Sequence, residues 1–422
     1  MKNAVSICDA QHPYELRPDK EPLMNPKKLA ALAATVLVLA GGLSACSSGA
    51  GADESKTVAK PFKAWKQPTV NSSMTVDEAA KIVATATKPT TEWTGPTSGP
   101  KAVKAKQAIA YVSSDQSYVS YVNWGDGVKD AAAKLGWSVH VFDGKGTVSG
   151  NLSAMQQAVA SDPVAIVTSA DASALQAPIA QAVTKKIPVI GIHASAFPGP
   201  DPQLNLFDNI ASDPAEIGRT QAAYVVAESN GTAKLAHMLD NSYAIARFKA
   251  KAATEPVKNL STATFLEEIN IPVADQANRI PSAVSALLSK YGKANVWITT
   301  CCDNFYPYVA SALRSSNVKP DEVKLVGADG SPSAYDMIRK GQYEVATVPE
   351  PSTLFGYQAV DAIVRAQAGQ EPAKFIQPTY LVTKDNVDQE GGDKDQYIPS
   401  NNFACHYANV WLGQDDACTA KP

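Results

Sequence analysis

The sequence has few histidines and no clustered basic residues. Only five of its 422 residues are histidine, and 38 Lys and Arg face 41 Asp and Glu, which gives a formal net charge of −3. No basic run is longer than a pair such as Lys27-Lys28. This balance creates no positive field for a polyanion, so nucleic acid is not an expected partner.

Signatures of catalysis and of nucleotide binding are also missing. The chain contains no GxSxG, no HExxH and no GxGxxG pattern. Its candidate polar residues show no obvious pairing of a nucleophile with a base. We therefore expect a binding protein rather than an enzyme, with no cofactor. The histidines are scattered, so no metal site is expected either.

An export signal stands near the N-terminus. Residues 24–46 have a basic start, an apolar run from Leu29 to Leu43 and small residues before a cysteine. The run is too short to span a membrane comfortably, which takes about 20 residues. Leu43-Ser44-Ala45-Cys46 resembles a bacterial lipobox, which makes Cys46 the expected lipidation site. The alternative is a chance cysteine after an ordinary secretory signal.

The first hundred residues divide into two parts. Residues 1–45 are interpreted as an N-terminal extension with the lipoprotein signal peptide, and Met24 as the true start. Residues 46–104 are interpreted as a tether with a small docking segment, because SSGAGADESK is small and polar. Within that segment, residues 75–88 fit one helix with Thr75 as its cap.

From residue 107 onward, short apolar runs alternate with helical patterns. AIAYV, SVHVF, VAIVTS and IPVIGI form a first set, and KLAHML, TATFLEEI, NVWITT and KLVGA form a second. This alternation predicts parallel sheets with crossover helices. The predicted fold class is α/β, with two doubly wound parallel-sheet lobes.

Residues 324–351, KLVGADGSPSAYDMIRKGQYEVATVPEP, read as strand, acidic turn, helix, strand and acidic turn. Asp329 and Glu350 stand where two consecutive strands end. Ligands in open α/β sheets collect at the carboxyl ends of strands, so the two carboxylates suggest one binding cleft. The alternative for Asp329 is that it only caps the following helix.

This stretch resembles the last βαβ unit of the ribose-type periplasmic binding proteins. Asp329-Gly330 and Ala346–Glu350 fall on the family's Asp-Gly and ATVxxP-like positions, although the family usually has Gln at the place of Glu350. The resemblance covers roughly residues 105–385. It implies a three-stranded hinge with crossings near Asp213, Glu350 and Thr379. It also implies the lobe boundaries: 105–212 with 350–378 for lobe 1, and 213–349 with 379–422 for lobe 2 and the C-terminal tail.

Three departures from the family's sugar-binding pattern matter. His193-Ala194 stands where the family usually has Asp-Arg, and Lys249 takes the ligand-facing place of an arginine. Cys301-Cys302-Asp303-Asn304 replaces an Asn-Asp pair. Lysine is a point charge, so bidentate recognition of the usual pentoses and hexoses is in doubt.

The expected ligand-binding residues follow the strand ends or match the family's motifs. Tyr118 and Tyr121 sit where the family often has aromatic residues that sandwich a sugar ring; lobe packing is the alternative. Cys301 and Cys302 could form an oxidised vicinal pair or remain buried thiols. The full expected set is Ser113, Asp115, Tyr118, Tyr121, His193, Lys249, Asp303, Asp329 and Glu350.

The tail holds two further cysteines. Cys405 and Cys418 lie a short loop apart, and an exported chain meets oxidising conditions. We expect them to form one disulfide.

Together these patterns predict an extracytoplasmic, lipid-anchored solute-binding protein. The resemblance to the ribose-type periplasmic binding proteins implies that it acts as a monomer, captures a small polar, carbohydrate-like ligand between its lobes and delivers that ligand to ABC permease subunits. The carboxylates favour a ligand that is rich in hydroxyl groups or cationic. The alternatives are a ligand-sensing subunit for a membrane receptor or kinase and, less strongly, a hydrolase.

Overall fold

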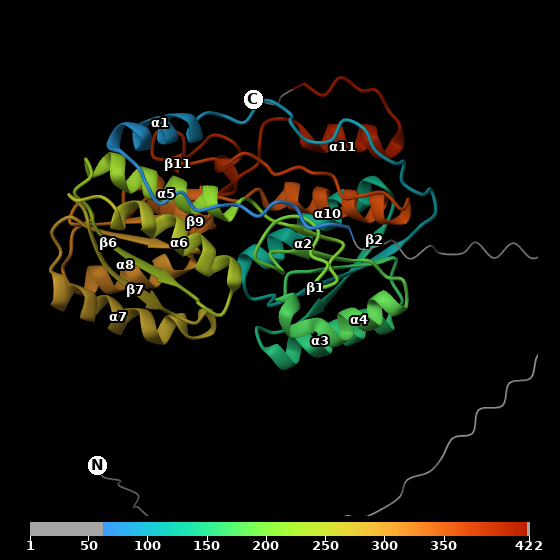
Figure 1. The fold of residues 1–422 in the computed structure, drawn as a ribbon, viewed down its shortest axis with the longest axis horizontal. Coiled ribbons are helices and arrows are strands. Elements are labelled where there is room, and N and C mark those ends of the chain that lie inside the picture. The colour runs from blue at the N-terminus through green and yellow to red at the C-terminus, as the bar shows by residue number, and fades with distance from the viewer. Residues whose placement is uncertain (1–61, 420–422) are drawn as a thin grey trace, which may run out of the picture. The chain divides into compact units, whose positions relative to one another are not determined.

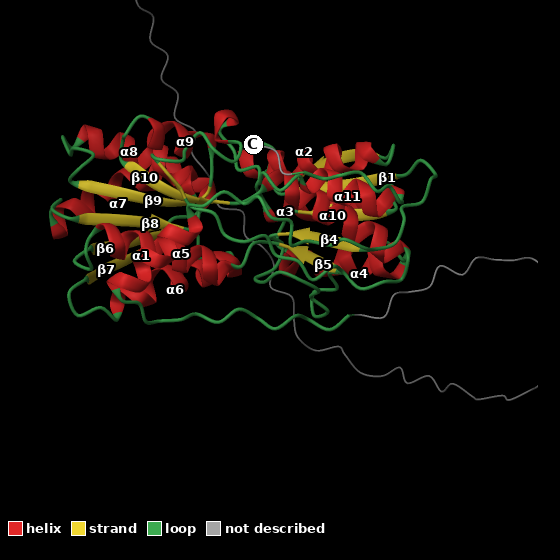
Figure 2. Ribbon diagram, turned by 90° about the horizontal axis from the view of Figure 1, so that it is seen from above, coloured by secondary structure: helices red, strands yellow, loops and turns green. Residues whose placement is uncertain are grey.

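The computed structural model describes residues 62–419. The signal region and Cys46 lie outside the described residues. Two sheets, each flanked by helices, organise the described part of the chain (Figures 1 and 2).

Lobe 1 is built on a five-stranded parallel sheet with the order β2-β1-β3-β4-β5. Helices α2 and α10 cover one face of this sheet, and α3 and α4 cover the other (Figure 1). The elements are β1 Ala108–Ser113, α2 Val119–Lys134, β2 Ser138–Asp143, α3 Val148–Ala160, β3 Ala165–Thr168, α4 Gln176–Thr184, β4 Val189–Ile192, β5 Asp208–Ile210 and α10 Ser352–Gln367.

Lobe 2 repeats the same strand order and adds one antiparallel edge strand, in the order β7-β6-β8-β9-β10-β11. Its elements are α5 Pro214–Glu228, β6 Lys234–Leu239, α6 Ala244–Lys258, β7 Thr264–Asn270, α7 Gln276–Tyr291, β8 Val296–Thr300, α8 Tyr306–Ser315, β9 Val323–Asp329, α9 Pro332–Arg339, β10 Glu344–Pro349 and β11 Val382–Thr383. The predicted fold class of two doubly wound lobes is confirmed.

The inner strands read as continuous apolar runs because both faces of each sheet are covered there. Five of the six residues of β1 are buried, and all four of β3. Close packing of two helices explains two glycines of lobe 1. A Cβ on Gly127 of α2 or on Gly356 of α10 would meet the backbone of the facing helix, so only glycine allows this approach.

A segment before lobe 1 contacts both lobes. Phe62 meets Phe207 of lobe 1 edge to face, with ring centroids 5.5 Å apart. Helix α1, Val76–Ala86, then packs on lobe 2, and Thr75 and Glu78 form its capping box. Trp93 returns to the core of lobe 1 beside Phe375. Residues 62–104 are therefore packed against the lobes, more extensively than a tether with one docking helix.

The C-terminal tail also divides between the lobes. Tyr380 and Tyr397 pack on lobe 2 with Tyr335 of α9. Helix α11, Phe403–Leu412, instead packs on α10 in lobe 1, where Trp411 stacks on Tyr357. Assigning the whole of 379–422 to lobe 2 was therefore wrong, because the apolar face of α11 completes the core of lobe 1.

Cys405 and Cys418 are bonded, with their Cα atoms 5.6 Å apart, which links the end of the tail to α11. Among residues 62–419, no helix is both long and apolar enough to cross a membrane.

Candidate functional site

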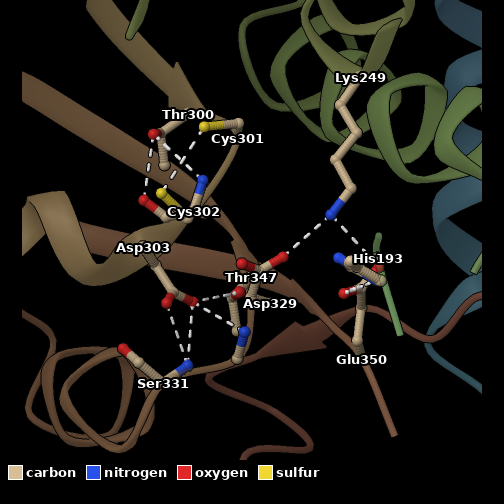
Figure 3. Close-up of polar contacts among 12 residues, drawn as sticks. His193, Lys249, Thr300, Cys301, Cys302, Asp303, Asp329, Ser331, Thr347 and Glu350 are labelled. Atoms are coloured by element: carbon tan, nitrogen blue, oxygen red, sulfur yellow. Dashed lines mark hydrogen bonds and ion pairs between the residues drawn. The ribbon is translucent and has the colours of Figure 1, made fainter. Parts of the chain in front are cut away.

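Four polar side chains, carried by β4, α6, β9 and β10 or the residue after them, meet at the carboxyl ends of the strands (Figure 3). Lys249 reaches down from α6, and its Nζ lies 3.0 Å from Asp329 Oδ1 and 3.2 Å from Glu350 Oε1. His193, at the end of β4 in lobe 1, places Nε2 3.0 Å from Glu350 Oε2. We call these residues the charged group. It joins lobe 1 to lobe 2 at the hinge crossing that follows β10.

The loops that carry these side chains have left-handed backbone conformations. Asp329 has a φ of 82° and His193 a φ of 57°, which are uncommon for residues other than glycine. Gly330, with a φ of 77°, continues the turn after β9. The Glu350 N–H donates to the Asp329 carbonyl oxygen, which fixes one strand end against the next. Such conformations cost free energy and occur often at ligand sites.

Not every polar atom of the charged group has a hydrogen-bond partner. Lys249 Nζ donates a hydrogen bond to Asp329. The two Glu350 oxygens and His193 Nε2 are at ion-pair distance from their neighbours but make no hydrogen bond of proper geometry with any described residue. A buried polar atom without a hydrogen bond is costly. The Glu350 oxygens are held mainly by ion pairs, so they keep lone pairs that the hydroxyl groups of a ligand can use.

The surroundings shift the pKa values of the charged group in different directions. Burial opposes ionisation of Glu350, but His193 and Lys249 outweigh it and lower its pKa to about 2. For Asp329 burial prevails over the attraction of Lys249, and its pKa is raised. Burial also opposes the Lys249 cation, but Asp329 and Glu350 raise its pKa. Lys249 therefore stays protonated and Glu350 stays ionised, whereas the Asp329 carboxyl takes up a proton more readily than a free one.

A wall of aromatic rings from lobe 1 adjoins the charged group. The Trp124 ring lies 4.7 Å from the His193 ring, and Phe355 at the start of α10 lies 5.8 Å from it. Tyr121 continues the wall, at 5.3 Å from Trp124 and 4.7 Å from Tyr118. Burial is the main cause that raises the pKa of both tyrosines, so their hydroxyls stay protonated.

Two further contacts join the lobes beside this wall. Phe197 of lobe 1 meets Phe248 of α6 edge to face at 4.9 Å. Tyr243, which precedes α6, lies close enough to Tyr121 for each hydroxyl to affect the pKa of the other. The described structure therefore has the lobes in contact over the strand ends.

The expected site residues separate into two sets. Tyr118, Tyr121, His193, Lys249, Asp329 and Glu350 come together as described above. Asp303 is fully buried and turns away from Lys249, toward the turn after β9, where it accepts from Gly330 N–H, Ser331 N–H and the Thr347 hydroxyl (Figure 3). Asp303 therefore lies apart from the charged group, and its carboxyl orients the turn that carries Asp329; direct binding of ligand by Asp303 stays a prediction.

The two residues expected at the end of β1 lie outside the charged group. Asp115 accepts from Ser117 N–H and Oγ and shapes its own loop. Ser113 is fully buried, and its hydroxyl has no hydrogen-bond partner among the described residues. No contact recorded for residues 62–419 joins either residue to the charged group, so their binding role stays a prediction.

Sequence reasoning did not single out Phe355, Phe197 or Tyr243. Phe355 offered a signal, because it opens the helix that follows the Glu350 strand end, as Tyr118 and Tyr121 open the helix after β1. Phe197 lies in an irregular segment between β4 and β5, where no periodicity marks a binding residue.

The structure offers no stronger alternative site among the described residues. A surface hollow of about 670 Å³ lies on lobe 2 beside Tyr224, Gln342 and Lys384, and it includes no member of the charged group. Within residues 62–419, no cluster of three or more His, Cys, Asp or Glu side chains is placed to hold a metal ion.

Comparison with known proteins gives one consistent family. Residues 109–371 match the model of the periplasmic binding protein domain. The ribose import binding protein of Salmonella typhimurium is 23% identical over 284 residues, which cover 66% of this chain and 92% of that protein. The chain belongs to this family and is of its ribose-binding-protein type.

Solved structures show the same fold. An ABC transporter solute-binding protein from Agrobacterium vitis with bound allitol has a TM-score of 0.59 at 18% identity, covering 68% of this chain and 98% of that one. One from Mycobacterium smegmatis with bound glycerol has a TM-score of 0.59 at 18% identity, covering 75% and 100%.

Proposed function

We propose that this member of the periplasmic binding protein family captures a small, uncharged polyol or sugar between its lobes and delivers it to an ABC importer. The protein would do this on the outer side of the cytoplasmic membrane. The observation that carries the proposal is the charged group, which is buried between the lobes beside an aromatic wall. Relatives named for ribose import, and similar folds with bound allitol and glycerol, support this class of ligand.

The electrostatics of the site favour a neutral ligand over a charged one. Lys249 lies between Asp329 and Glu350, so it offsets much of the negative charge that the sequence alone suggests. A cationic ligand would compete with Lys249 for the same oxygens, and an anion would meet Glu350, whose low pKa keeps it ionised. Hydroxyl groups can donate to the Glu350 oxygens and accept from Lys249 without either penalty.

The aromatic wall supports the same ligand class. A sugar or polyol has C–H faces as well as hydroxyl edges. The C–H faces can pack on rings such as Trp124 and Tyr121, while the hydroxyls face the charged group. No pairing of a nucleophile with a base is needed for this role, so we propose a binder without catalytic activity.

Calorimetry on the purified protein tests the proposal. We expect saturable binding of at least one of ribose, allitol and glycerol, and no binding of a sugar phosphate or sugar acid. Lys249→Met should weaken this binding by a factor of about 10 or more. A protein that binds only the acidic sugars, or none of the three neutral probes, would contradict the proposed ligand class.

We also propose that the protein works as a monomer tethered to the membrane through Cys46. The lipobox-like LSAC sequence supports the tether. Wild type should fractionate with membranes and Cys46→Ala with the soluble proteins. A wild-type protein recovered soluble, with unmodified Cys46, would contradict the anchor. Copurification with permease subunits would support import, whereas copurification with a receptor or kinase would support a sensor.

A further inference from the structure

The proposed function leaves two features of the structure unused. One is the pair Cys301 and Cys302, which are thiols buried in the core of lobe 2. The other is the segment of residues 62–104, which we call the arm and which precedes the residues 109–371 that match the family model. In Figures 1 and 2 the arm starts as an extended stretch that runs from lobe 1 to α1 on lobe 2. It then returns to lobe 1, so it crosses between the lobes twice, in addition to the hinge.

The arm begins on the irregular loop between β4 and β5 of lobe 1. Trp65 packs on Gly199 of this loop so closely that a Cβ on Gly199 would overlap the Trp65 ring. The same loop carries Phe197, which meets Phe248 of α6 across the lobe interface. The arm is therefore attached to the part of lobe 1 that lies against lobe 2.

Hydrogen bonds then attach the arm to two helices of lobe 2. Arg219 of α5 donates to the carbonyl oxygens of Asn71, at 3.4 Å, and of Ser73, at 3.2 Å. Asn259, the C-cap of α6, donates to the Ser72 carbonyl oxygen at 2.9 Å. Helix α1 follows and packs on α5. The first crossing therefore links the loop of Phe197 to the helix that carries Phe248 and Lys249.

The second crossing joins the lobes again within three residues. The Thr90 hydroxyl forms a hydrogen bond of 2.9 Å with the hydroxyl of Tyr397, which packs on lobe 2. Trp93 stacks on His406 of α11, with ring centroids 5.0 Å apart, and α11 belongs to the core of lobe 1. Both ends of this crossing are thus fixed by side chains of the opposite lobes.

Neither crossing has much length to release. Residues 66–70 and 89–92 form neither helix nor strand. Six residue steps from Trp65 to Asn71 span at most about 20 Å, and three steps from Thr90 to Trp93 at most about 10 Å. Opening of the lobes must part Phe197 from the helix α6, to which the arm is also attached. A segment that is already extended cannot lengthen to follow this movement.

We propose that the arm is a strap that limits how far the lobes open, so that the ligand-free protein stays near the closed arrangement. The proposal rests on the proposed function in one respect, namely that the lobes close over a ligand. It extends that function, because the apparent affinity for a ligand rises with the fraction of protein in the binding-competent arrangement. The strap would thus strengthen binding without touching the ligand.

The test lengthens both crossings and leaves their attachment points in place. Four glycines are inserted between Gln67 and Pro68 and four between Thr91 and Glu92, where surface chain tolerates insertion at a small cost. The matched control has eight glycines after Gly292, in the exposed turn that follows α7. Small-angle X-ray scattering is measured on each full chain without ligand. We expect a larger radius of gyration for the lengthened protein than for the control. Equal radii in these two proteins would overturn the strap.

Calorimetry on the same proteins tests the effect on binding. The lengthened protein should bind each neutral probe more weakly than the control, by the same factor for every probe that binds, because the insertions change closure and not the contacts of the ligand. A larger radius with unchanged affinity would overturn the effect on binding. Failure of wild type to bind any neutral probe would count against the proposed function alone, since the scattering comparison needs no ligand.

Discussion

The two lobes share one strand order but present different chemistry to the site between them. Lobe 1 contributes mainly rings, among them Trp124, Tyr121 and Phe355. Lobe 2 contributes Lys249 and Asp329, and Glu350 follows its strand β10. The topology fixes only where a ligand can bind, and the residues after each strand decide what it can be.

This difference suggests that the two lobes contact different parts of the ligand: lobe 1 its C–H surfaces and lobe 2 its hydroxyl groups. Rings hold C–H surfaces with little regard to direction, whereas charged and hydrogen-bonding groups fix hydroxyl positions. Lobe 2 should therefore set specificity, and lobe 1 should add affinity that varies little between similar polyols. Of the four predictions below, three test this division and one tests the charge state of a buried carboxyl in lobe 2; they follow in order of expected effect.

The largest effect is expected from removing the cation of lobe 2. Lys249→Met leaves Asp329 and Glu350 without the side chain that lies between them. A hydrogen bond to a charged group typically contributes about 1.5–3 kcal/mol, so losing the Lys249 ammonium as a donor to a ligand hydroxyl should weaken polyol affinity by a factor of about 10 to 150. Calorimetry with the best of the neutral probes measures the loss.

Arg247→Met is the matched control for this change. Arg247 is exposed in the same helix, two residues before Lys249. Its replacement should leave affinity within about a factor of two, as for most exposed substitutions. Equal losses in the two variants would mean that the charge of α6 acts at long range and that Lys249 has no special place in the site.

The second prediction concerns the carboxyl of Glu344, the first residue of β10, in the interior of lobe 2. Glu344 is fully buried beside Asp303, and neither of its carboxyl oxygens has a hydrogen-bond partner among the described residues. Burial is the main cause that raises its pKa well above the ordinary value, and Asp303 adds to the effect. The folded protein therefore keeps a proton that the unfolded chain releases above about pH 4.3.

The sign of the pH dependence follows from this difference. The contribution of Glu344 to stability is fully present below the unfolded pKa and is lost as pH rises toward the folded pKa. Glu344→Gln has no proton to lose, so it should gain stability relative to wild type between pH 5 and pH 7. The gain should approach roughly 1.4 kcal/mol per pH unit at most.

Urea unfolding at the two pH values checks this gain. Glu371→Gln, at an exposed position after α10, should show none. A Glu344→Gln variant that tracks wild type at both pH values would show that Glu344 is ionised in the folded protein.

The charged group was largely predictable from the sequence, and so were Tyr118 and Tyr121 of the aromatic wall, whereas Phe355 was not. Asp329 and Glu350 follow recognisable strands, and Lys249 matches a family motif. The direction of a side chain at a strand end is harder to predict. Asp303 and Asp329 both stand at strand ends. The Asp303 carboxyl accepts hydrogen bonds from the N–H groups of Gly330 and Ser331, whereas the Asp329 carboxyl accepts from Lys249.

Contacts between segments far apart in the chain could not be predicted from the sequence either. The apolar pattern of α11 predicts a buried face but does not say which lobe buries it, and Trp411 packs on Tyr357 of lobe 1. In the same way, Phe62 and Trp93 are ordinary apolar residues until the fold brings them to lobe 1 on either side of α1.

The third prediction weakens the wall of lobe 1. Trp124 is buried against His193, so Trp124→Leu removes ring surface without adding charge. We expect roughly tenfold weaker binding, by a similar factor for each neutral polyol that binds, because loss of one stacking partner costs about 1 kcal/mol or slightly more. Calorimetry across the probes measures the factor, and thermal melting confirms that the variant is folded. Losses that differ widely between polyols would assign specificity to lobe 1 and break the division proposed above.

The smallest effect should come from a contact that belongs to both lobes. Phe197 and Phe248 meet edge to face at 4.9 Å, one from each lobe, so the pair forms only when the lobes are together. Aromatic pairs of this geometry contribute about 0.5–1.5 kcal/mol beyond the area that they bury. Because ligand affinity scales with the closed population, a double-mutant cycle of Phe197→Leu and Phe248→Leu on polyol affinity should give a coupling of about 1 kcal/mol. Each single variant should then weaken binding by about fivefold, and the double variant should be little worse than either one. Strictly additive effects in the cycle would mean that the two rings do not meet in the ligand-bound protein, and the lobes would then close in a different relative position from the one described here.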